Sequence, residues 1–503
     1  MKKTLFITLF LFFSISAALS QWISPGNGTV YSLRDLVEIT EGCVTYQDSV
    51  DAYFLHADLT IAPNDCLKVT ASDCQTTPPD AIGIISEGDV MINIQGSIQI
   101  EIEGMYVYFL PWAEENHLRI RIENSSAPCV FNHTRFTYIS GVQIIESEVT
   151  FQHCLFQNID MEYATGAVTY MNCDPVFNDC VFQGNYGSAI SSGANVTGSP
   201  QITRCDFRYN VLSKENRPQL NLGPGGEDTI RIVNSRVIGL YPLVGGISIS
   251  DLMQTGSTKV LLKGNFIADN RYGYNQQGYT IDALIVDNEF VCNQIEENPM
   301  NGGSGISIYG ASTECKAKIR HNLIKGNIWG VTVIAQAMVD MGTADDYGHN
   351  MIFNNHNNST GTQQEYALYV NGVNDVTAIG NYWGGDNEED AESVIYHRPD
   401  LGEEYGLVSY SPILTENHWT VEETMTENVS IYPNPTNGLV TLRMDQVQGF
   451  DYEIYNLQGQ QLLKGHSKGS ETIIDLSAYP AGLYVVSIIH DSSNIPVIRK
   501  IIR

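Results

Sequence analysis

The chain has 503 residues, of which 57 are Asp or Glu and 27 are Lys or Arg, so its formal net charge is −30. A surface this acidic repels phosphate backbones and anionic lipid headgroups, so no nucleic-acid partner is expected. The length predicts two or three domains, unless one long repeat occupies most of the chain.

The first 20 residues have the organisation of a secretory leader. Lys2 and Lys3 precede an apolar run, and Ala18 and Ser20 suit cleavage before Gln21. The run is short for a membrane-spanning helix and no other long apolar stretch follows, so no transmembrane segment is expected. Residues 1–20 are therefore predicted to be a signal peptide.

Residues 21–84 are predicted to cap the N-terminal end of the next domain. In "SLRDLVEIT", Ser32 and Asp35 have the spacing of a helix capping box, and Leu33, Leu36 and Val37 fall on one helical face. A helix of this kind can cover an exposed sheet edge. The segment "DVMINIQGSIQIEIEG" (89–104) then alternates with period two, as strands do.

Ten segments share one frame, in which apolar residues lie on either side of a recurrent small or polar position. Examples are "FNDCVFQGN" (177–185), "IVDNEFVCN" (285–293) and "IRHNLIKGN" (319–327). The recurrent position returns every 20 to 34 residues, which marks a solenoid. It is occupied by Thr134, Cys154, Cys180, Cys205, Ser235, Asn265, Asn288, Asn322, Asn350 and Asn381.

The residue types select a solenoid of strands. The apolar positions are rich in β-branched and aromatic residues, which favour strands, and short strands bury an apolar face when coils stack about 4.8 Å apart. Asparagines in the bends of successive coils can then form a hydrogen-bonded ladder. Residues 85–414 are therefore predicted to form a parallel β-helix of at least ten coils.

Five of the ten cysteines support a prediction, in two groups. Cys154, Cys180 and Cys205 share the recurrent position, so stacking holds their side chains parallel and too far apart for disulfides, and we expect buried thiols. Cys66 and Cys74, in "CLKVTASDC", are the better candidates for a loop disulfide.

The repeat ends in "GNYWGG" (380–385), and its texture resembles the right-handed parallel β-helix proteins of the pectin-lyase-like group. The resemblance covers about residues 85 to 415. It implies the fold but no single activity, because this fold hosts lyases, hydrolases, adhesins and inert scaffolds.

The chain changes character after a polar linker at residues 415–428. Residues 429–503 contain short alternating strands separated by Pro- and Gly-rich turns, which predict a small Ig-like antiparallel β-sandwich. The segments "YPNPTNG" (432–438), "YNLQGQ" (455–460) and "DLSAYPAGLYVV" (475–486) resemble the C-terminal sorting domain of type IX secretion cargo in Bacteroidetes. That resemblance implies type IX secretion machinery as a partner. It also implies delivery through the periplasm to the outer-membrane surface or the medium, with the domain cut away in the linker.

Candidate site residues fall into three groups, each with an ordinary structural alternative. Asp287, His321 and His349 precede the ladder position in successive coils and could share a metal ion or a proton, although such a column also suits hydrated turns. Arg231 and Arg236, with Asp206 and Arg208 one coil away, could bind a uronate or form surface ion pairs. The acidic run "DNEEDAE" (386–392) could hold Ca²⁺ through Asp386, Glu388, Glu389 and Asp390. It lacks the glycine-spaced loop of a dedicated calcium site.

Two functions follow from this pattern. The first is an exported cell-surface or secreted β-helix protein that binds glycans or another surface. It is favoured because the outward positions Ser248, Ser307 and Thr332 include no carboxylate, and because side loops such as 294–304 and 335–346 interrupt the coils. The alternative is a polysaccharide lyase or glycoside hydrolase of the pectin-lyase-like group. In that case the candidate catalytic residues are Arg231, Arg236, Asp287 and His321.

Overall fold

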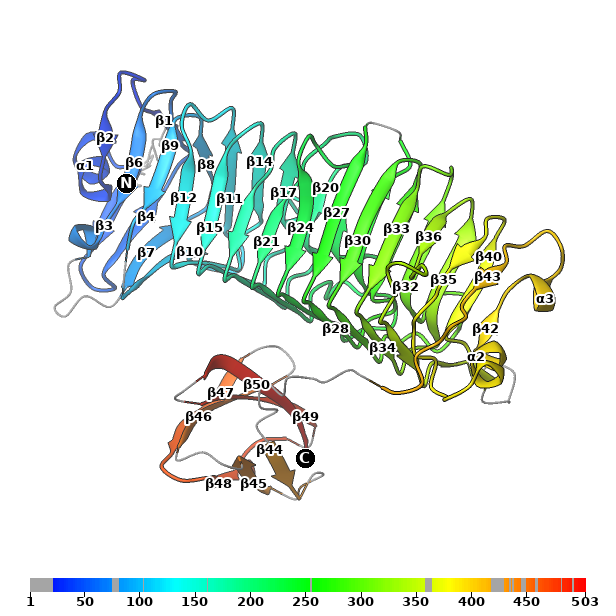
Figure 1. The fold of residues 1–503 in the computed structure, drawn as a ribbon. Helices are drawn as coiled ribbons and strands as arrows, with labels where there is room; N and C mark the ends of the chain where they lie inside the picture. Colours follow the sequence, from blue (N-terminus) through cyan, green and yellow to red (C-terminus); the bar gives the residue numbers. More distant parts are fainter. Residues whose placement is uncertain are drawn as a thin grey trace, which may run out of the picture. The chain divides into compact units, whose positions relative to one another are not determined.

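The computed structural model describes residues 21–74, 81–102, 104–160, 162–253, 256–357, 364–417 and most of 429–503. The predicted leader and residues 418–428 of the predicted linker lie outside the described residues. The chain divides into two compact units, one ending at Glu416 and the other beginning at Asn417. The first is a right-handed parallel β-helix, as the sequence predicted, in which each regular coil gives one strand to each of three sheets (Figure 1).

Sheet A has 14 strands and carries the groove described below. Its middle strands include the seven-residue segment "GGISISD", whose successive side chains point to opposite faces of the sheet. In order the strands are β1 (Trp22–Ile23), β5 (Leu59–Ile61), β8 (Asp89–Ile94), β11 (His117–Glu123), β14 (Val142–Ile145), β17 (Gly166–Met171), β20 (Ser188–Ser192), β23 (Pro218–Leu222), β26 (Gly245–Asp251), β29 (Tyr274–Gly278), β32 (Ser304–Gly310), β35 (Trp329–Ala335), β40 (Leu368–Gly372) and β42 (Ile395–Tyr396).

Sheet B also has 14 strands, and each follows the sheet A strand of its own coil. They are β2 (Val30–Tyr31), β6 (Cys66–Val69), β9 (Ser97–Ile100), β12 (Cys129–Asn132), β15 (Val149–Gln152), β18 (Val176–Asn178), β21 (Gln201–Thr203), β24 (Thr229–Val233), β27 (Thr258–Lys263), β30 (Ile281–Val286), β33 (Lys316–Arg320), β36 (Met338–Asp340), β41 (Val376–Thr377) and β43 (Val408–Ser409).

Sheet C closes the coils with 13 short strands. They are β3 (Val44–Gln47), β4 (Ala52–Leu55), β7 (Ala81–Ser86), β10 (Tyr106–Pro111), β13 (Thr134–Thr137), β16 (Leu155–Gln157), β19 (Val181–Gln183), β22 (Asp206–Arg208), β25 (Arg236–Ile238), β28 (Phe266–Ala268), β31 (Glu289–Val291), β34 (Leu323–Lys325) and β37 (Met351–Phe353). A separate two-stranded ribbon joins β38 (His356–Asn357) to β39 (Gln364–Glu365).

The turn between sheets B and C carries the predicted ladder. Asn288 Nδ2 donates to Asn322 Oδ1 at 2.9 Å, and Asn322 Nδ2 donates to Asn350 Oδ1 at 3.0 Å. Ser235 continues the same line, because its amide donates to Asn265 Oδ1 at 2.8 Å. The residue before each ladder position has a positive φ, from 48° at His133 to 72° at Gly380, which turns the chain from one sheet into the next.

A second amide ladder lies after the sheet C strands. Asn270, Asn293, Asn327 and Asn355 are linked by side-chain hydrogen bonds of 2.9 to 3.2 Å. Between the ladders the core contains stacked rings, with Phe156 and Phe182 only 4.4 Å apart between centroids. Like residues therefore lie above like residues through the whole β-helix, as a stacked repeat requires.

None of the ten cysteines forms a disulfide in this structure. Cys154, Cys180 and Cys205 are buried in the ladder line, as predicted. The disulfide suggested between Cys66 and Cys74 is not formed. Cys66 instead lies in β6, and the Sγ of Cys74 donates to the carbonyl oxygen of Ala81 at 3.5 Å.

The ends of the β-helix are covered. Helix α1 (Leu33–Ile39) begins with the predicted capping box between Ser32 and Asp35, and it buries Leu33 and Leu36. Helices α2 (Glu388–Val394) and α3 (Arg398–Leu401) lie at the other end (Figure 1). The sheets start earlier than residue 85, because β1, β2, β5 and β6 within the expected cap already pair in parallel with later coils.

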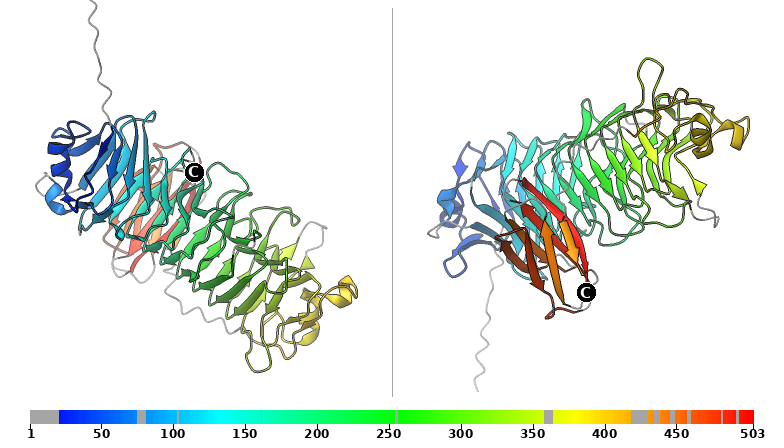
Figure 2. Two further views of the ribbon diagram at one scale, coloured as in Figure 1. Left: turned by 90° about the horizontal axis from the view of Figure 1, so that it is seen from above. Right: turned by 60° about the horizontal axis from the view of Figure 1, so that its bottom comes forward.

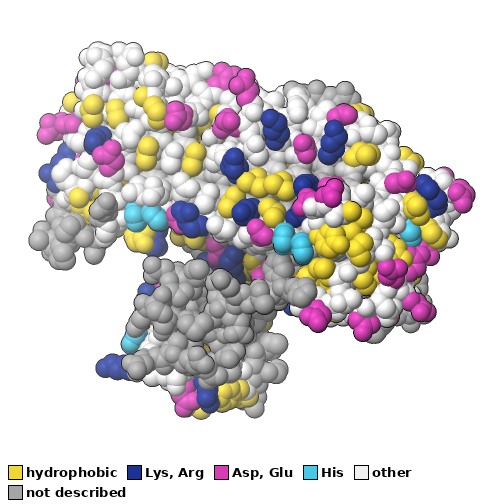
Figure 3. Space-filling model, in the orientation of Figure 1, with side chains coloured by type: hydrophobic (Ala, Val, Ile, Leu, Met, Phe, Trp, Pro, Cys, Tyr) yellow, Lys and Arg dark blue, Asp and Glu magenta, His cyan; other side chains and the backbone are white. Residues whose placement is uncertain are grey.

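The outer surface carries charges of both signs. Figure 2 shows the coils stacked in chain order from two further sides. On the face seen in Figure 3, acidic and basic side chains are interspersed, and hydrophobic side chains gather toward the C-terminal coils. Within the described residues, no helix is long and apolar enough to cross a membrane.

The second unit contains two antiparallel sheets, as predicted. One joins β44 (Val429–Tyr432), β45 (Leu439–Met444) and β48 (Glu471–Asp475). The other joins β46 (Phe450–Tyr455), β47 (Gln461–Ser467), β49 (Leu483–His490) and β50 (Ser493–Ile502). Val440, Phe450 and Val486 belong to one buried cluster that draws on both sheets, which makes the unit a small β-sandwich.

Candidate functional site

The backbone conformation explains why Asp287, His321 and His349 occupy equivalent positions in successive coils. All three have positive φ (59°, 51° and 51°) and occupy the turn before the ladder, where Asp and His are enriched. Asp287 lies 3.8 Å from Lys263 Nζ, whereas the rings of His321 and His349 stack with centroids 4.8 Å apart. The backbone of the turn therefore accounts for Asp and His at this column.

The predicted arginine pair lies on two different sheets. Arg231 is exposed on β24 of sheet B, whereas Arg236 lies on β25 of sheet C, with the turn at Asn234 between them. Arg236 is in register with Asp206, and its guanidinium lies 5.8 Å from the Phe266 ring centroid. The two arginines consequently do not face one ligand from one surface.

The acidic run begins a helix. Asn387 caps α2 by accepting from the amide of Asp390 at 2.9 Å, and Glu388, Glu389 and Asp390 form the first turn. Negative charges there interact favourably with the helix dipole, which explains the run without a metal ion. Asp386 is tied to the Asn387 side chain at 3.1 Å.

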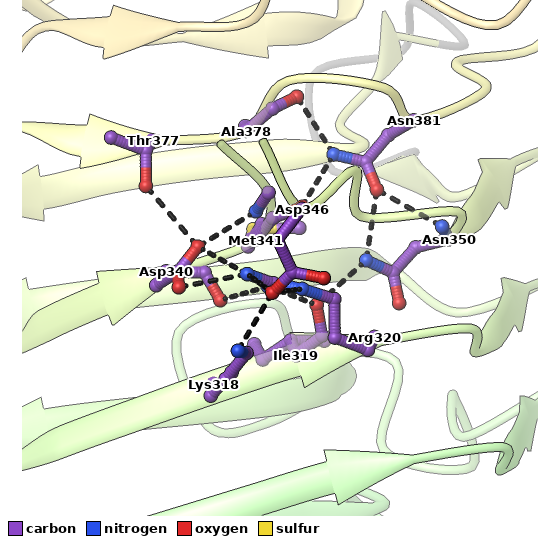
Figure 4. A network of polar contacts seen from close by, with 11 residues as sticks. Lys318, Ile319, Arg320, Asp340, Met341, Asp346, Asn350, Thr377, Ala378 and Asn381 are labelled. Atoms are coloured by element: carbon purple, nitrogen blue, oxygen red, sulfur yellow. Dashed lines mark hydrogen bonds and ion pairs between the residues drawn. The ribbon is translucent and has the colours of Figure 1, made fainter. Parts of the chain in front are cut away.

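A buried arginine beside the ladder organises the turn after β36 (Figure 4). Arg320 is 4% exposed, and its Nη2 donates to both carboxylate oxygens of Asp340 at 2.8 Å. The same nitrogen donates to Asp346 at 3.1 Å, and Lys318 approaches Asp346 at 2.7 Å. These contacts lower the pKa of Asp346, Lys318 contributing most. The network holds the 341–350 segment against the coil. The carboxylates of both Asp340 and Asp346 are paired with a cation.

A groove on the outer face of sheet A is the strongest candidate site. It has a volume of about 590 Å³ and runs across the strands from β23 to β40. One row of its lining is in register from coil to coil, namely Asn221, Ser248, Asn275, Ser307, Thr332 and Tyr369. Such a row offers hydroxyl and amide groups at steps of about 4.8 Å. This regular spacing suits a ligand that itself repeats.

Aromatic rings stand at the C-terminal end of this groove. Trp329 lies 4.7 Å from Tyr366 and 5.1 Å from Tyr369 between ring centroids, and Tyr366 lies 4.5 Å from Tyr396. The indole Nε1 donates to the carbonyl oxygen of Pro299 at 3.0 Å, which fixes the ring. Burial raises the pKa of Tyr369 and of Tyr396, so both hydroxyls stay neutral at physiological pH. The result is a half-buried platform with polar edges.

Two side loops form the walls. The loop after β31 gives Pro299, Met300 and Asn301, and the loop after β22 gives Asn216 and Arg217. Arg271 joins the two walls, because its Nε donates to the carbonyl oxygen of Asn301 at 2.5 Å and its Nη1 donates to Asn216 Oδ1.

Tyr272 is packed beneath the groove against Gly245. A Cβ on Gly245 would lie 2.2 Å from the Tyr272 ring, so the glycine makes room for it. Burial raises the pKa of Tyr272 to about 12.

The charge of the groove differs from that of the chain. Its lining, within the described residues, includes Arg217 and Arg271 but no Asp or Glu, although the chain has 57 acidic residues. Arg217 is paired with Glu215 at 2.7 Å. The hydrogen bonds of Arg271 go to the uncharged oxygens of Asn301 and Asn216, and its guanidinium lies 5.9 Å from the centroid of the Tyr272 ring, so within the described residues no carboxylate neutralises its charge.

Sequence reasoning placed Ser248, Ser307 and Thr332 in one outward line, and the register agrees. It missed Arg271, Trp329 and Tyr369. A usable signal was present for two of them, because Trp329 begins the strand that contains Thr332 and Tyr369 follows one coil later.

Two protein families match parts of the chain, and one of them is a secretion domain. Residues 430–503 match the secretion system C-terminal sorting domain, and residues 229–383 match a family described as a protein of unknown function (DUF1565). None of the curated proteins compared matches the chain. The chain is a secreted β-helix protein of the Bacteroidetes kind, with a type IX sorting domain at its C-terminal end.

Solved structures similar to the chain include mutants of the periplasmic alginate epimerase AlgG. A threonine-to-asparagine mutant is 12% identical with a TM-score of 0.45, covering 76% of this chain and 84% of that chain. An aspartate-to-alanine mutant is 11% identical with a TM-score of 0.45, covering 76% of this chain and 83% of that chain.

Proposed function

We propose that the protein binds an extracellular glycan in the groove of sheet A. The observation that carries the proposal is the combination of the in-register polar row with the aromatic platform around Trp329. Sugar rings present apolar C–H faces and polar hydroxyl edges, which complement aromatic faces and rows of amide and hydroxyl groups respectively.

The sorting domain supports an extracellular setting for such binding, since it marks the chain for export. Delivery by type IX secretion, with passage through the periplasm, is part of this proposal. The lining of the groove does not supply the pair of carboxylates that glycoside hydrolysis uses, among the residues described. Binding without cleavage is therefore the better-supported activity of this surface.

The experiment is a binding screen of the purified exported chain against neutral and acidic polysaccharides, with and without Ca²⁺. Trp329→Ala should weaken binding at least tenfold, because it removes the centre of the platform. Trp112→Ala is the matched control, since Trp112 is 53% exposed on the same β-helix and does not line the groove. Equal affinity of the two variants would refute the proposal. Release of reducing ends or of unsaturated products would establish the lyase or hydrolase alternative instead.

A further inference from the structure

A second cluster lies on sheet A toward the N-terminal end, away from the strands of the groove. His117 begins β11, while Asp160 and Glu162 precede β17 two coils later. His117 Nδ1 lies 3.4 Å from Glu162 Oε2 and 4.0 Å from Asp160 Oδ2. Within the described residues, this is the one group that brings three possible metal ligands within 4.8 Å of one another.

The intervening coil fixes the geometry of the cluster. Ser140 is 1% exposed, its amide donates to the Leu118 carbonyl at 2.9 Å, and its hydroxyl donates to Asp160 Oδ2 at 3.1 Å. The same Oγ lies 3.2 Å from His117 Nδ1. Asp160 Oδ1 also accepts from the Glu162 amide at 3.0 Å. Ser140 thus holds the imidazole and the carboxylate side by side, through the same Nδ1 and Oδ2 atoms that face each other in the cluster.

The cluster opens into a cavity of about 200 Å³. The lining includes Asp89, Arg119 and Tyr163 besides His117 and Glu162. The cavity lining has the carboxylates of Asp89 and Glu162 and the guanidinium of Arg119, and Asp160 adds a third carboxylate through its contact with His117. This excess of negative charge would be neutralised by a divalent cation. The Nε of Arg119, a residue of the cavity lining, is buried without a hydrogen-bond partner among the described residues.

We propose that His117, Asp160 and Glu162 bind a divalent first-row transition metal ion, with an open position toward the cavity. One imidazole and two carboxylates suit Zn²⁺ or Mn²⁺, whereas Ca²⁺ takes oxygen ligands. Tetrahedral zinc with bonds of about 2.0–2.1 Å places its ligand atoms about 3.3 Å apart. The separations of 3.4 and 4.0 Å therefore need only a small closure around the ion. Water or an anionic group of a ligand would take the open position.

The test measures Zn²⁺ binding to the purified full chain by competition with a chromogenic chelator. Wild-type protein should bind one more Zn²⁺ per chain than His117→Ala, and Glu162→Gln should weaken that site at least tenfold. Ca²⁺ at the same concentration should not displace the Zn²⁺.

His56→Ala is the matched control, because His56 forms a two-member pair with Glu87 at 3.0 Å. It should keep the wild-type stoichiometry and affinity. Circular dichroism and thermal melting of each variant separate loss of the ion from loss of the fold. The proposal is overturned if wild-type protein and His117→Ala bind the same amount of Zn²⁺, or if His56→Ala loses as much as His117→Ala.

Discussion

Asn288 and Asn322, 34 residues apart in the chain, are hydrogen-bonded neighbours in adjacent coils. Asn322 Oδ1 accepts from both the main-chain amide and the Nδ2 of Asn288, each at 2.9 Å. Asn322 Nδ2 donates in turn to the carbonyl oxygens of Ile285 and Arg320 at 2.9 and 2.8 Å. The same Nδ2 also donates to Asn350 Oδ1 at 3.0 Å, so one fully buried side chain bonds to groups from three consecutive coils.

Replacing Asn322 by Ala should lower the free energy of unfolding of the β-helix by about 3 kcal/mol, since buried donors and acceptors lose their partners. Urea unfolding followed by circular dichroism measures the effect. Asn298→Ala, in an exposed side loop, is the control and should change stability by no more than about 0.5 kcal/mol. Equal stability of the two variants would contradict a structural role for the ladder.

The stability of the first coil should depend on pH because of Asp65. Burial alone would raise its pKa, but hydrogen bonds from Ser24 and from the amides of Gly26, Gly28 and Thr29 lower the pKa overall. A lowered pKa gives stability that is present above the unfolded pKa of about 3.9 and is lost as the pH falls through the folded pKa. Asp65→Asn should cost about 2 kcal/mol at pH 7 and progressively less below pH 4. A difference independent of pH would exclude this linkage.

The three stacked cysteines of the ladder line should not react with thiol reagents in the native protein. Cys154, Cys180 and Cys205 are at most 2% exposed, and burial raises the pKa of Cys180 well above its usual range. Labelling of denatured, unreduced protein should detect ten thiols per chain, whereas the native protein should leave these three unlabelled. Cys180→Ser should lower the denatured count by one. A count below ten in the denatured, unreduced protein would contradict this prediction.

Arg271 should give the groove a preference for acidic polysaccharides. Arg271→Gln should weaken binding of an acidic polysaccharide about tenfold and should reduce its dependence on salt, while binding of a neutral one changes less. Arg231→Gln is the control, because Arg231 is an exposed arginine on sheet B outside the groove. Equal losses for the two variants would mean that long-range charge, and not this contact, governs binding.

If residues 429–503 are removed, the β-helix should remain in the periplasm. The deleted unit has its own buried core and includes the match to the sorting domain, so the β-helix should still fold. Fractionation and surface labelling of cells that produce the truncated chain measure the outcome. Unchanged delivery to the surface or the medium would contradict export through this domain.

The sequence determined the repeat because stacking places equivalent residues on top of one another. The line from Thr134 to Asn381, the buried cysteines and the aromatic column could all be predicted, since each depends on spacing within one coil. The capping box at Ser32 and the two antiparallel sheets at the C-terminal end are equally local patterns.

Only the tertiary structure decided which surface residues meet. The column of Asp287, His321 and His349 is explained by positive φ at a turn, a backbone property that the residue types alone left open. Arg271 and Trp329 line one groove because two side loops fold onto sheet A, and loop conformation is not fixed by the period of the repeat. His117 meets Asp160 for a similar reason, since their approach depends on the coil between them, in which buried Ser140 contacts both side chains.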